Sequence, residues 1–156
     1  MKSTAQKGFT LIELLVVIGI LAVLLAITLI AINPARQFSQ ANNTKRSSDV
    51  NAILNAVGQY AADNKGNLTA LNIPDTTAGA AVIGSNTTGG QVDLCNALVP
   101  TYIAQLPVDP QYGTYTNCTS YDTQYTIVRS TTDNRITVSA TRTEIPPATA
   151  TITVTR

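Results

Sequence analysis

The sequence predicts an α+β fold in which one long N-terminal helix is followed by a small antiparallel sheet. Three observations support this prediction. The stretch from Leu14 to Ile32 has no charged residue and consists almost entirely of Leu, Ile, Val and Ala. Apolar residues then recur at intervals of three and four as far as Ala61, which is the spacing of one helix face. From Gln124 onward, apolar and polar residues alternate, as they do in strands with one buried face.

The apolar stretch is long enough to cross a membrane, because about 20 apolar residues span the ~30 Å hydrocarbon core of a bilayer. It is longer than the apolar part of an ordinary signal peptide, and no small-x-small cleavage site follows it at the expected place. Glu13 lies near its start, and a carboxylate at membrane depth needs a positively charged partner. We therefore expect residues 9–33 to form a transmembrane helix and Glu13 to be a functional residue.

Residues 34–66 are expected to continue this helix as an amphipathic segment. Proline in a helix interior removes a backbone hydrogen bond, so the helix either kinks or breaks at Pro34, and the helical spacing that resumes afterwards favours a kink. Asn64-Lys65-Gly66 is a typical helix stop. The apolar face of the segment should pack on the core of the head, and its members are Val50, Ile53, Leu54, Val57 and Ala61.

Residues 67–156 are expected to form a small globular head. Its first part, residues 67–91, is rich in Gly, Ala, Thr and Asn, which predicts a long loop with a short strand at residues 81–83. Residues 92–98 suit a short helix, and residues 112–121 are rich in turn formers. Three further strands are predicted, the last of them an edge strand or an extended tail: residues 124–129, 135–141 and 148–155.

Cys95 and Cys118 are the only cysteines of the chain. Because they follow an export anchor they should face an oxidising compartment, and we expect them to form one disulfide. This bond would close a loop of about 24 residues, worth ~3 kcal/mol in the chain-entropy treatment. Two free, buried thiols are the alternative. There is no C-x-x-C pair and no histidine, so no zinc site is expected.

The composition argues against an enzyme and against a nucleic-acid binder. The chain has no histidine, no G-x-S-x-G motif, no phosphate-binding loop and no cluster with metal-ligand spacing, so we expect no catalytic residue and no cofactor. Its formal net charge is +1 over 156 residues. A nearly neutral chain has no electrostatic attraction for nucleic acid or for acidic substrates.

The residues Gly8-Phe9-Thr10-Leu11-Ile12-Glu13-Leu14-Leu15 resemble the prepilin motif of the type IV pilin family, which includes the pseudopilins of type II secretion and competence systems. The resemblance implies that a prepilin peptidase cuts after Gly8 and N-methylates Phe9, the new N-terminus. Residues 1–8 are then a leader peptide, whose two lysines leave with it, so that the net charge becomes −1. Glu13 would pair with the Phe9 amine of a neighbouring subunit during assembly.

The resemblance implies a structural subunit of a type IV pilus-like filament, in which the apolar helices pack in the centre and the heads lie outside. Before assembly the chain would be a single-pass protein of the inner membrane, in contact with lipid and with its head in the periplasm. Its partners would be the prepilin peptidase, the inner-membrane assembly machinery and other copies, which together form an extracellular pilus. No nucleic-acid partner is expected for such a major subunit.

Two other members of the same family remain open as alternatives. The first is a pseudopilin that builds a periplasmic pseudopilus for type II secretion or for DNA uptake in competence. The second, less expected, is a minor tip pilin that acts as an adhesin or binds DNA. All of them share the N-terminal motif, so the motif does not separate them.

Two further features bear on the resemblance. Secretion pseudopilins of the family allow a calcium site, for which Asp109, Asn117 and Asp122 could supply oxygen ligands here. They do not form a dense cluster, so we expect turn formation instead and no bound metal. The family's early helix proline would fall at Ile30, whereas this chain has Pro34, which leaves open where the helix bends.

Overall fold

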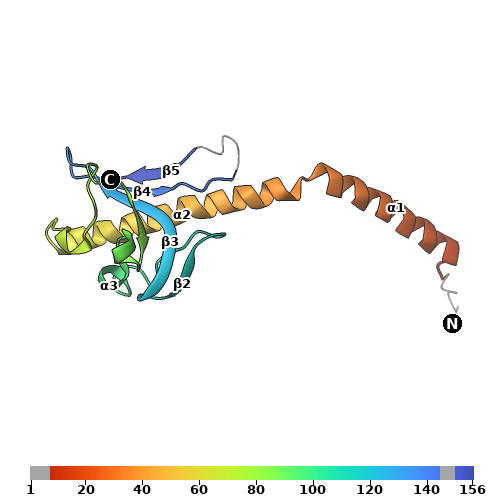
Figure 1. Cartoon of the computed structure of the whole chain (residues 1–156). Coiled ribbons are helices and arrows are strands. Elements are labelled where there is room, and N and C mark those ends of the chain that lie inside the picture. The colour runs from red at the N-terminus through yellow and green to blue at the C-terminus, as the bar shows by residue number, and fades with distance from the viewer. Residues whose placement is uncertain (1–7, 145–149) are drawn as a thin grey trace. The chain divides into compact units, whose positions relative to one another are not determined.

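The computed structural model describes residues 8–144 and 150–156, and the chain divides into two compact units, Met1–Phe38 and Ser39–Arg156. The elements are labelled in Figure 1. The helices are α1 (Leu11–Ala31), α2 (Pro34–Asp63), α3 (Cys95–Leu98) and two short 3₁₀ turns, η1 (Thr69–Leu71) and η2 (Thr87–Gly89). The strands are β1 (Ala81–Gly84), β2 (Thr114–Asn117), β3 (Ser120–Arg129), β4 (Ile136–Ala140) and β5 (Ile152–Thr155). This is the α+β architecture that the sequence predicts.

The predicted continuous helix is in fact two helices, and the expectation of a kink at Pro34 is wrong. Helix α1 ends at Ala31 and α2 begins at Pro34, so the helical ladder is interrupted between them. The side chain of Asn33 accepts a hydrogen bond from the backbone N–H of Arg36 at 3.2 Å, which is the geometry of a helix N-cap. Proline suits the first position of a helix, where its missing N–H has no partner to lose. Asn33-Pro34 therefore starts a new helix rather than bending an old one.

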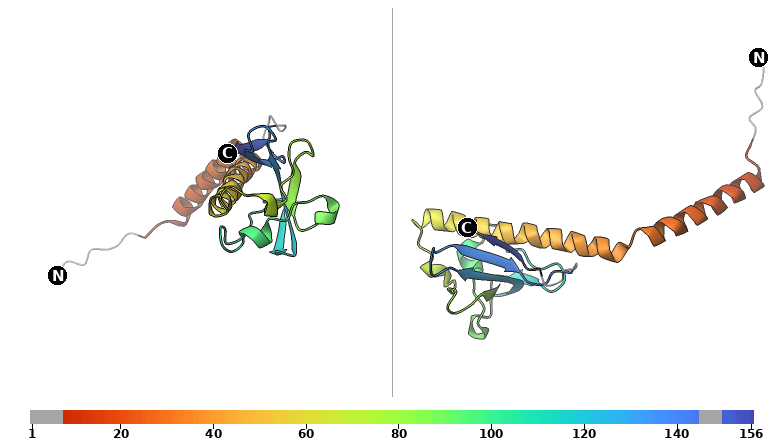
Figure 2. Two further views of the ribbon diagram at one scale, coloured as in Figure 1. Left: turned by 90° about the vertical axis from the view of Figure 1, so that its left-hand side faces the viewer. Right: turned by 90° about the horizontal axis from the view of Figure 1, so that it is seen from above.

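Within the head, α2 lies along one face of the sheet (Figures 1 and 2). Four members of the predicted apolar face, Val50, Ile53, Leu54 and Val57, are buried, whereas Ala61 is only half-buried. The helix ends as predicted, with Gly66 at a φ of +82° and its N–H bonded to the carbonyl of Ala61. The buried side of α2 also contains two charged residues, Arg46 and Asp49, which the sequence analysis did not predict to be buried.

The sheet is antiparallel, with the strand order β1-β3-β4-β5, and β2 also pairs with β3. Strand β3 is its centre: Ile127 pairs with Ala81 on one side and with Val138 on the other. Alternate residues of β3 and β4 are buried and form the core with the apolar face of α2. Strand β5 is at the edge of the sheet, in the role predicted for the C-terminal segment, of which residues 145–149 lie outside the described residues.

The predicted strands are present, and sequence reasoning missed one. Strand β2 lies in the segment predicted to be all turns, and it pairs with the start of β3 through Tyr115 and Tyr121. Most of its side chains are exposed, so it has no alternation of buried and exposed residues to reveal it. Strand β3 begins at Ser120, four residues before its predicted start, because the hairpin with β2 extends it.

Candidate functional site

The N-terminal end of α1 holds the residues that the prepilin motif singles out. Thr10 caps the helix: its hydroxyl oxygen accepts a hydrogen bond from the backbone N–H of Glu13 at 3.3 Å. In return, the Glu13 carboxylate accepts hydrogen bonds from the backbone N–H and the hydroxyl of Thr10, at 2.8 and 2.7 Å. This reciprocal arrangement is a capping box, which the spacing Thr-x-x-Glu could have predicted. The box holds the carboxylate against the start of its own helix.

The negative charge of Glu13 has no cation beside it in the described part of the chain, where none of the ion pairs involves this residue. Phe9 is 91% exposed, and it borders the same shallow hollow on the helix surface as Glu13, Leu14 and Val17. Phe9 precedes the N-cap Thr10, so it lies just outside the helix, next to its first turn. The structure thus places these two predicted site residues beside the same hollow, and none of the ion pairs among the described residues involves either of them.

Gly8, the predicted cleavage residue, is not required by the fold. A Cβ atom built at this position meets no other atom within 4 Å, and the backbone has no positive φ there. A larger side chain would therefore fit the chain itself. The fold of the described chain therefore gives no reason for a glycine at this position.

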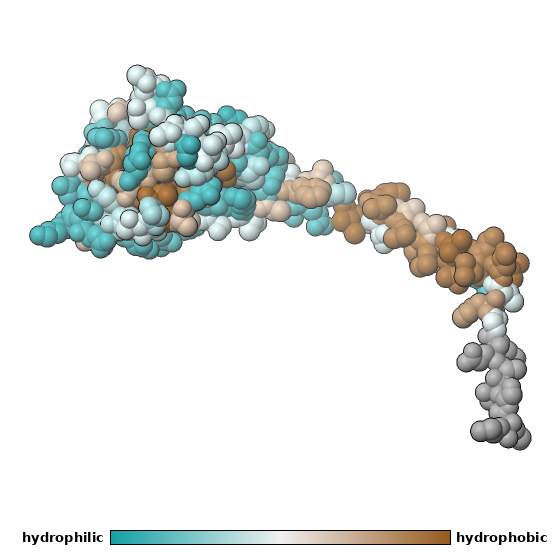
Figure 3. All heavy atoms as spheres, turned by 90° about the horizontal axis from the view of Figure 1, so that it is seen from below, coloured by the Kyte–Doolittle hydropathy of each residue, from teal (hydrophilic) through white to brown (hydrophobic). Residues whose placement is uncertain are grey.

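Helix α1 is brown along the face that Figure 3 shows. Apart from Glu13, Gly19 and Thr28, every residue from Leu11 to Ala31 is Leu, Ile, Val or Ala, so the helix is apolar around its circumference. It has 21 residues, and none of them is buried in the described part of the chain. By length and composition it could cross a membrane. A helix that is hydrophobic all round needs lipid or other protein on every side. Since none of its residues is buried in the described part of the chain, we expect lipid or other protein to cover it.

The head is held together by a buried arginine, Arg46, whose side chain has no exposed surface. Its Nε and Nη2 donate hydrogen bonds to the carboxylate of Asp109 at 2.7 and 3.2 Å. Its Nη1 donates to Glu144 at 2.6 Å and to the side chain of Asn43 at 3.0 Å. Arg46 therefore ties α2 to the loop that follows α3 and to the segment that follows β4. We call Arg46, Asp109 and Glu144 the buried ion cluster.

The sequence analysis did not predict the buried ion cluster, although the position of Arg46 in the sequence indicates that it faces the core. Arg46 precedes Val50 by four residues, so the helical spacing extends the apolar face of α2 to a charged residue. Asp49, which is not a member of the predicted apolar face, is buried as well and accepts hydrogen bonds from Tyr125 at 2.8 Å and from Lys45 at 2.6 Å. The acidic partners of Arg46 could not be found from spacing, because they are 63 and 98 residues away along the chain.

Both carboxylates of the buried ion cluster have pKa values below their ordinary ranges. Burial by itself would raise the pKa of Asp109, but the hydrogen bonds from Arg46 and from the backbone N–H groups of Gln111 and Tyr112 outweigh it. Burial likewise opposes the shift at Glu144, and the hydrogen bond from Arg46 again lowers the pKa of this group. The two groups are therefore ionised in the folded head at neutral pH.

These shifts predict that the head loses stability in acid. A carboxylate whose pKa is lower in the folded state than in the unfolded state stabilises the fold above the unfolded pKa, and this contribution is lost as the pH falls through the folded pKa. With unfolded values of about 3.9 for Asp and 4.3 for Glu, we expect the free energy of unfolding to decline below about pH 4. Urea unfolding of the full chain in detergent micelles, followed by tyrosine circular dichroism between pH 7 and pH 2, measures the decline.

The control for this prediction is Asp109→Asn compared with Asp133→Asn. Asp133 also has a lowered pKa, caused first by its hydrogen bond from Ser130, but its side chain is 51% exposed and pairs only with a surface arginine. Asp109→Asn should flatten the acid decline, whereas Asp133→Asn should leave it nearly unchanged. Equal declines in both variants would contradict the assignment to the buried ion cluster.

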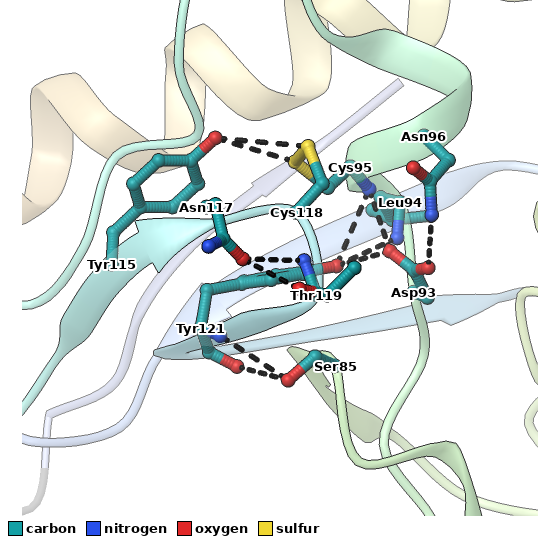
Figure 4. Close-up of a disulfide and its surroundings, with 10 residues drawn as sticks. All are labelled: Ser85, Asp93, Leu94, Cys95, Asn96, Tyr115, Asn117, Cys118, Thr119 and Tyr121. Carbon is teal, nitrogen blue, oxygen red and sulfur yellow. Dashed lines mark hydrogen bonds between the residues drawn. A yellow bond between two sulfur atoms is a disulfide. The ribbon is translucent and has the colours of Figure 1, made fainter.

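The expected disulfide is present between Cys95 and Cys118, with the two Cα atoms 5.2 Å apart (Figure 4). It joins the first residue of α3 to the turn between β2 and β3. The hydroxyl of Tyr121 accepts hydrogen bonds from the backbone N–H groups of Leu94 and Cys95 and donates one of 2.6 Å to Asp93. The disulfide and this tyrosine together fix the short helix against the sheet.

Each of the three possible calcium ligands named above accepts hydrogen bonds from other residues of the protein. Asp109 belongs to the buried ion cluster, and Asp122 accepts hydrogen bonds from a glutamine side chain and from a backbone N–H. Asn117 accepts from the backbone and the hydroxyl of Thr119, which is the turn chemistry expected of it. Among residues 8–144 and 150–156, no group of three His, Cys, Asp or Glu side chains is placed to hold a metal ion.

Two comparisons with known proteins found a match. The family model of the prokaryotic N-terminal methylation motif matches residues 3–29. The type II secretion system core protein G of Pseudomonas aeruginosa is 33% identical over 115 residues, which cover 74% of this chain and 75% of that protein. No solved structure matches the chain. Because 115 residues exceed the length of the N-terminal unit, the likeness extends well into the head. The chain therefore belongs to the family of type IV pilins and type II secretion pseudopilins, which are structural subunits of pilus-like filaments.

Proposed function

We propose that this chain is the repeating structural subunit of a type IV pilus-like filament, processed after Gly8 and held in the filament by α1. The observation that carries the proposal is α1 itself, a helix of 21 residues that is apolar on all sides and has no buried residue. Exposing this surface to water is unfavourable at roughly 25 cal/mol per Å². Lipid would cover it before assembly, and the helices of other copies would cover it in the filament.

Processing and the position of Glu13 together supply a way to align neighbouring subunits. Cleavage after Gly8 would free the amine of Phe9, and a peptidase that recognises the motif would methylate it. The Glu13 carboxylate has no cation beside it in the described part of the chain. In an apolar filament core it needs one. The Phe9 amine of the next subunit would supply this charge and set the axial register between the two subunits.

A second candidate, a pseudopilin of the type II secretion class, is favoured by one specific observation. The relative that matches over three quarters of its length carries the name of a type II secretion core protein. In both candidates the subunit would start in the inner membrane with its head in the periplasm. The two candidates differ in the location of the filament. A pilus extends outside the cell, whereas a secretion pseudopilus stays in the cell envelope.

Electron microscopy of filaments sheared from producing cells, together with mass spectrometry of the intact subunit, tests the proposal. We expect filaments whose subunit begins at methylated Phe9 and is lighter by two hydrogens for the disulfide. Filaments in the sheared fraction support the pilus subunit, and a processed subunit confined to the cell envelope supports the pseudopilin. An uncut chain in cells with an active prepilin peptidase would refute both candidates.

A further inference from the structure

The first turns of α2, residues 34–40, expose a phenylalanine shortly after the apolar helix α1. Phe38 is 71% exposed, and beyond Ile32 it and Tyr112 are the only large hydrophobic side chains that are exposed among the described residues. An isolated exposed apolar residue is ordinary on a protein surface, so its position along the chain must indicate what it does. Phe38 follows closely after a helix that could cross a membrane.

Phe38 belongs to a short apolar side of the helix. Residues three and four apart share a side of a helix, so Pro34 and Ala35 lie on the same side as Phe38. Arg36 is two residues from Phe38 and therefore lies on a different side. The other residues of this segment are polar: Gln37, Ser39 and Gln40. The start of α2 thus has the apolar side and the polar side that are typical of a helix in a membrane interface.

Arg36 is the charged residue of this segment. Its side chain is exposed, and none of the ion pairs among the described residues involves it. No acidic residue occurs in the sequence between Glu13 and Asp49. The two basic residues in the same interval have partners, because Lys45 pairs with Asp49 at 2.6 Å and Arg46 belongs to the buried ion cluster. The positive charge of Arg36 is therefore open to an anion from outside the chain.

The length of α1 sets the depth of this segment in a bilayer. The 21 residues of α1 span about 32 Å at the helical rise, which is close to the ~30 Å thickness of the hydrocarbon core. Arg36 follows Ala31, the last residue of α1, by five positions, which corresponds to about 8 Å at the same rise. The headgroup layer on each side of the core is about 5–8 Å thick. A long arginine side chain can reach back into this layer, as basic residues at the ends of membrane helices do.

We propose that residues 34–40 bind the phospholipid headgroups on the head side of the membrane, with the Arg36 guanidinium on a lipid phosphate and Phe38 at the boundary between headgroups and acyl chains. The inference rests on the proposed function, because it requires α1 in the membrane before assembly. A guanidinium donates two parallel hydrogen bonds to the oxygens of a phosphate. The partner is a lipid surface rather than free phosphate, since only a lipid offers phosphate and apolar chains together. The segment would hold the unassembled subunit at a fixed depth.

The depth of the segment can be measured by fluorescence, because the chain contains no tryptophan. Phe38→Trp introduces a single fluorophore. The full chain is reconstituted in vesicles of phosphatidylethanolamine and phosphatidylglycerol whose acyl chains carry bromine, a quencher, either near the headgroup or near the methyl end. We expect the emission of Phe38→Trp to be quenched mainly by the bromine near the headgroup.

Two further variants are the controls for depth. Tyr112→Trp introduces the fluorophore at the other exposed aromatic position, which is 54% exposed in the head, and neither lipid should quench it. Leu21→Trp introduces it at the middle of α1, where the bromine near the methyl end should quench it most. If Leu21→Trp is quenched and Phe38→Trp is not, only the interfacial site is refuted. If neither is quenched, α1 is not in the membrane, and the proposed function is refuted as well.

The contact between Arg36 and phosphate is measured by solid-state NMR in vesicles of the same lipids without bromine. The guanidinium carbons of all arginines are labelled with ¹³C, and dephasing of their signal by lipid ³¹P reports short distances between the two nuclei. We expect dephasing in the unmodified full chain and its loss in Arg36→Gln. Arg135→Gln is the matched control, because Arg135 is also exposed, at 65%, and its removal should leave the dephasing unchanged.

Four results would contradict the interfacial site. Two concern depth: Phe38→Trp escapes quenching, or Tyr112→Trp is quenched as strongly as Phe38→Trp, which would mean that the head as a whole contacts the bilayer. Two concern the phosphate: no arginine carbon is dephased, or the dephasing persists in Arg36→Gln.

Discussion

Replacing Arg46 with methionine should destabilise the head by about 3–5 kcal/mol, the usual cost of removing one partner from a buried ion pair. Methionine fills much of the same volume but donates no hydrogen bond. Asp109, whose side chain is 1% exposed, would then keep its charge in the interior without the guanidinium that neutralises it. Glu144 would lose its 2.6 Å bond to Arg46, so the segment after β4 would be held less firmly to α2. Urea unfolding of the full chain in micelles at pH 7 measures the change.

Two further variants isolate the cause. Arg135→Met removes an arginine that is 65% exposed and pairs with Asp133 at 3.4 Å, and it should cost no more than about 0.5 kcal/mol. Arg46→Met combined with Asp109→Leu removes both the cation and the stranded charge, and it should recover much of the stability lost in the single variant. The interpretation would be wrong if Arg46→Met cost no more than Arg135→Met.

Replacing Glu13 with glutamine should abolish filaments while leaving membrane insertion and cleavage intact. Glutamine keeps a side-chain oxygen that can accept both hydrogen bonds from Thr10, so the capping box of α1 survives. What is lost is the negative charge that would hold the amine of Phe9 from the next subunit. Electron microscopy of sheared fractions shows whether filaments form. Mass spectrometry of the membrane-bound subunit shows whether it is cleaved and methylated.

Thr28→Val is the matched control for the Glu13 variant. Thr28 is another polar residue of α1, and its hydroxyl donates only to the carbonyl of Leu25 in the same helix, at 2.9 Å. Valine has nearly the same shape, so filaments of normal number and length are expected. Normal filaments from Glu13→Gln would exclude the charge as the determinant of assembly. Loss of filaments in Thr28→Val would mean that the helix surface tolerates no change.

The break at Asn33-Pro34 shows how a single local signal can be interpreted in two ways. In the interior of a helix, proline bends or breaks the hydrogen-bond ladder. In the structure Asn33 caps and Pro34 occupies the first position of a new helix, a combination that favours helix initiation. Strand β2 was not predicted for another reason. Most of its side chains are exposed, so its sequence lacks the alternation that indicates a strand.

The elements that can be predicted from the sequence are those with local signals. The apolar helix is visible as a continuous run, α2 as a stripe at helical spacing, and β3 and β4 as alternation, because each depends on neighbours within a few residues. The motif from Gly8 to Glu13 is equally local, which is why the candidate processing and assembly residues could be named from it.

Which polar groups meet in the interior depends on how the chain folds, and local patterns do not predict it. Arg46 reaches Asp109 and Glu144 across 63 and 98 residues of sequence, and no local pattern encodes that pairing. Burial makes such pairings matter, since a charge or donor removed from water must find a partner, and only the folded chain determines which partner is near.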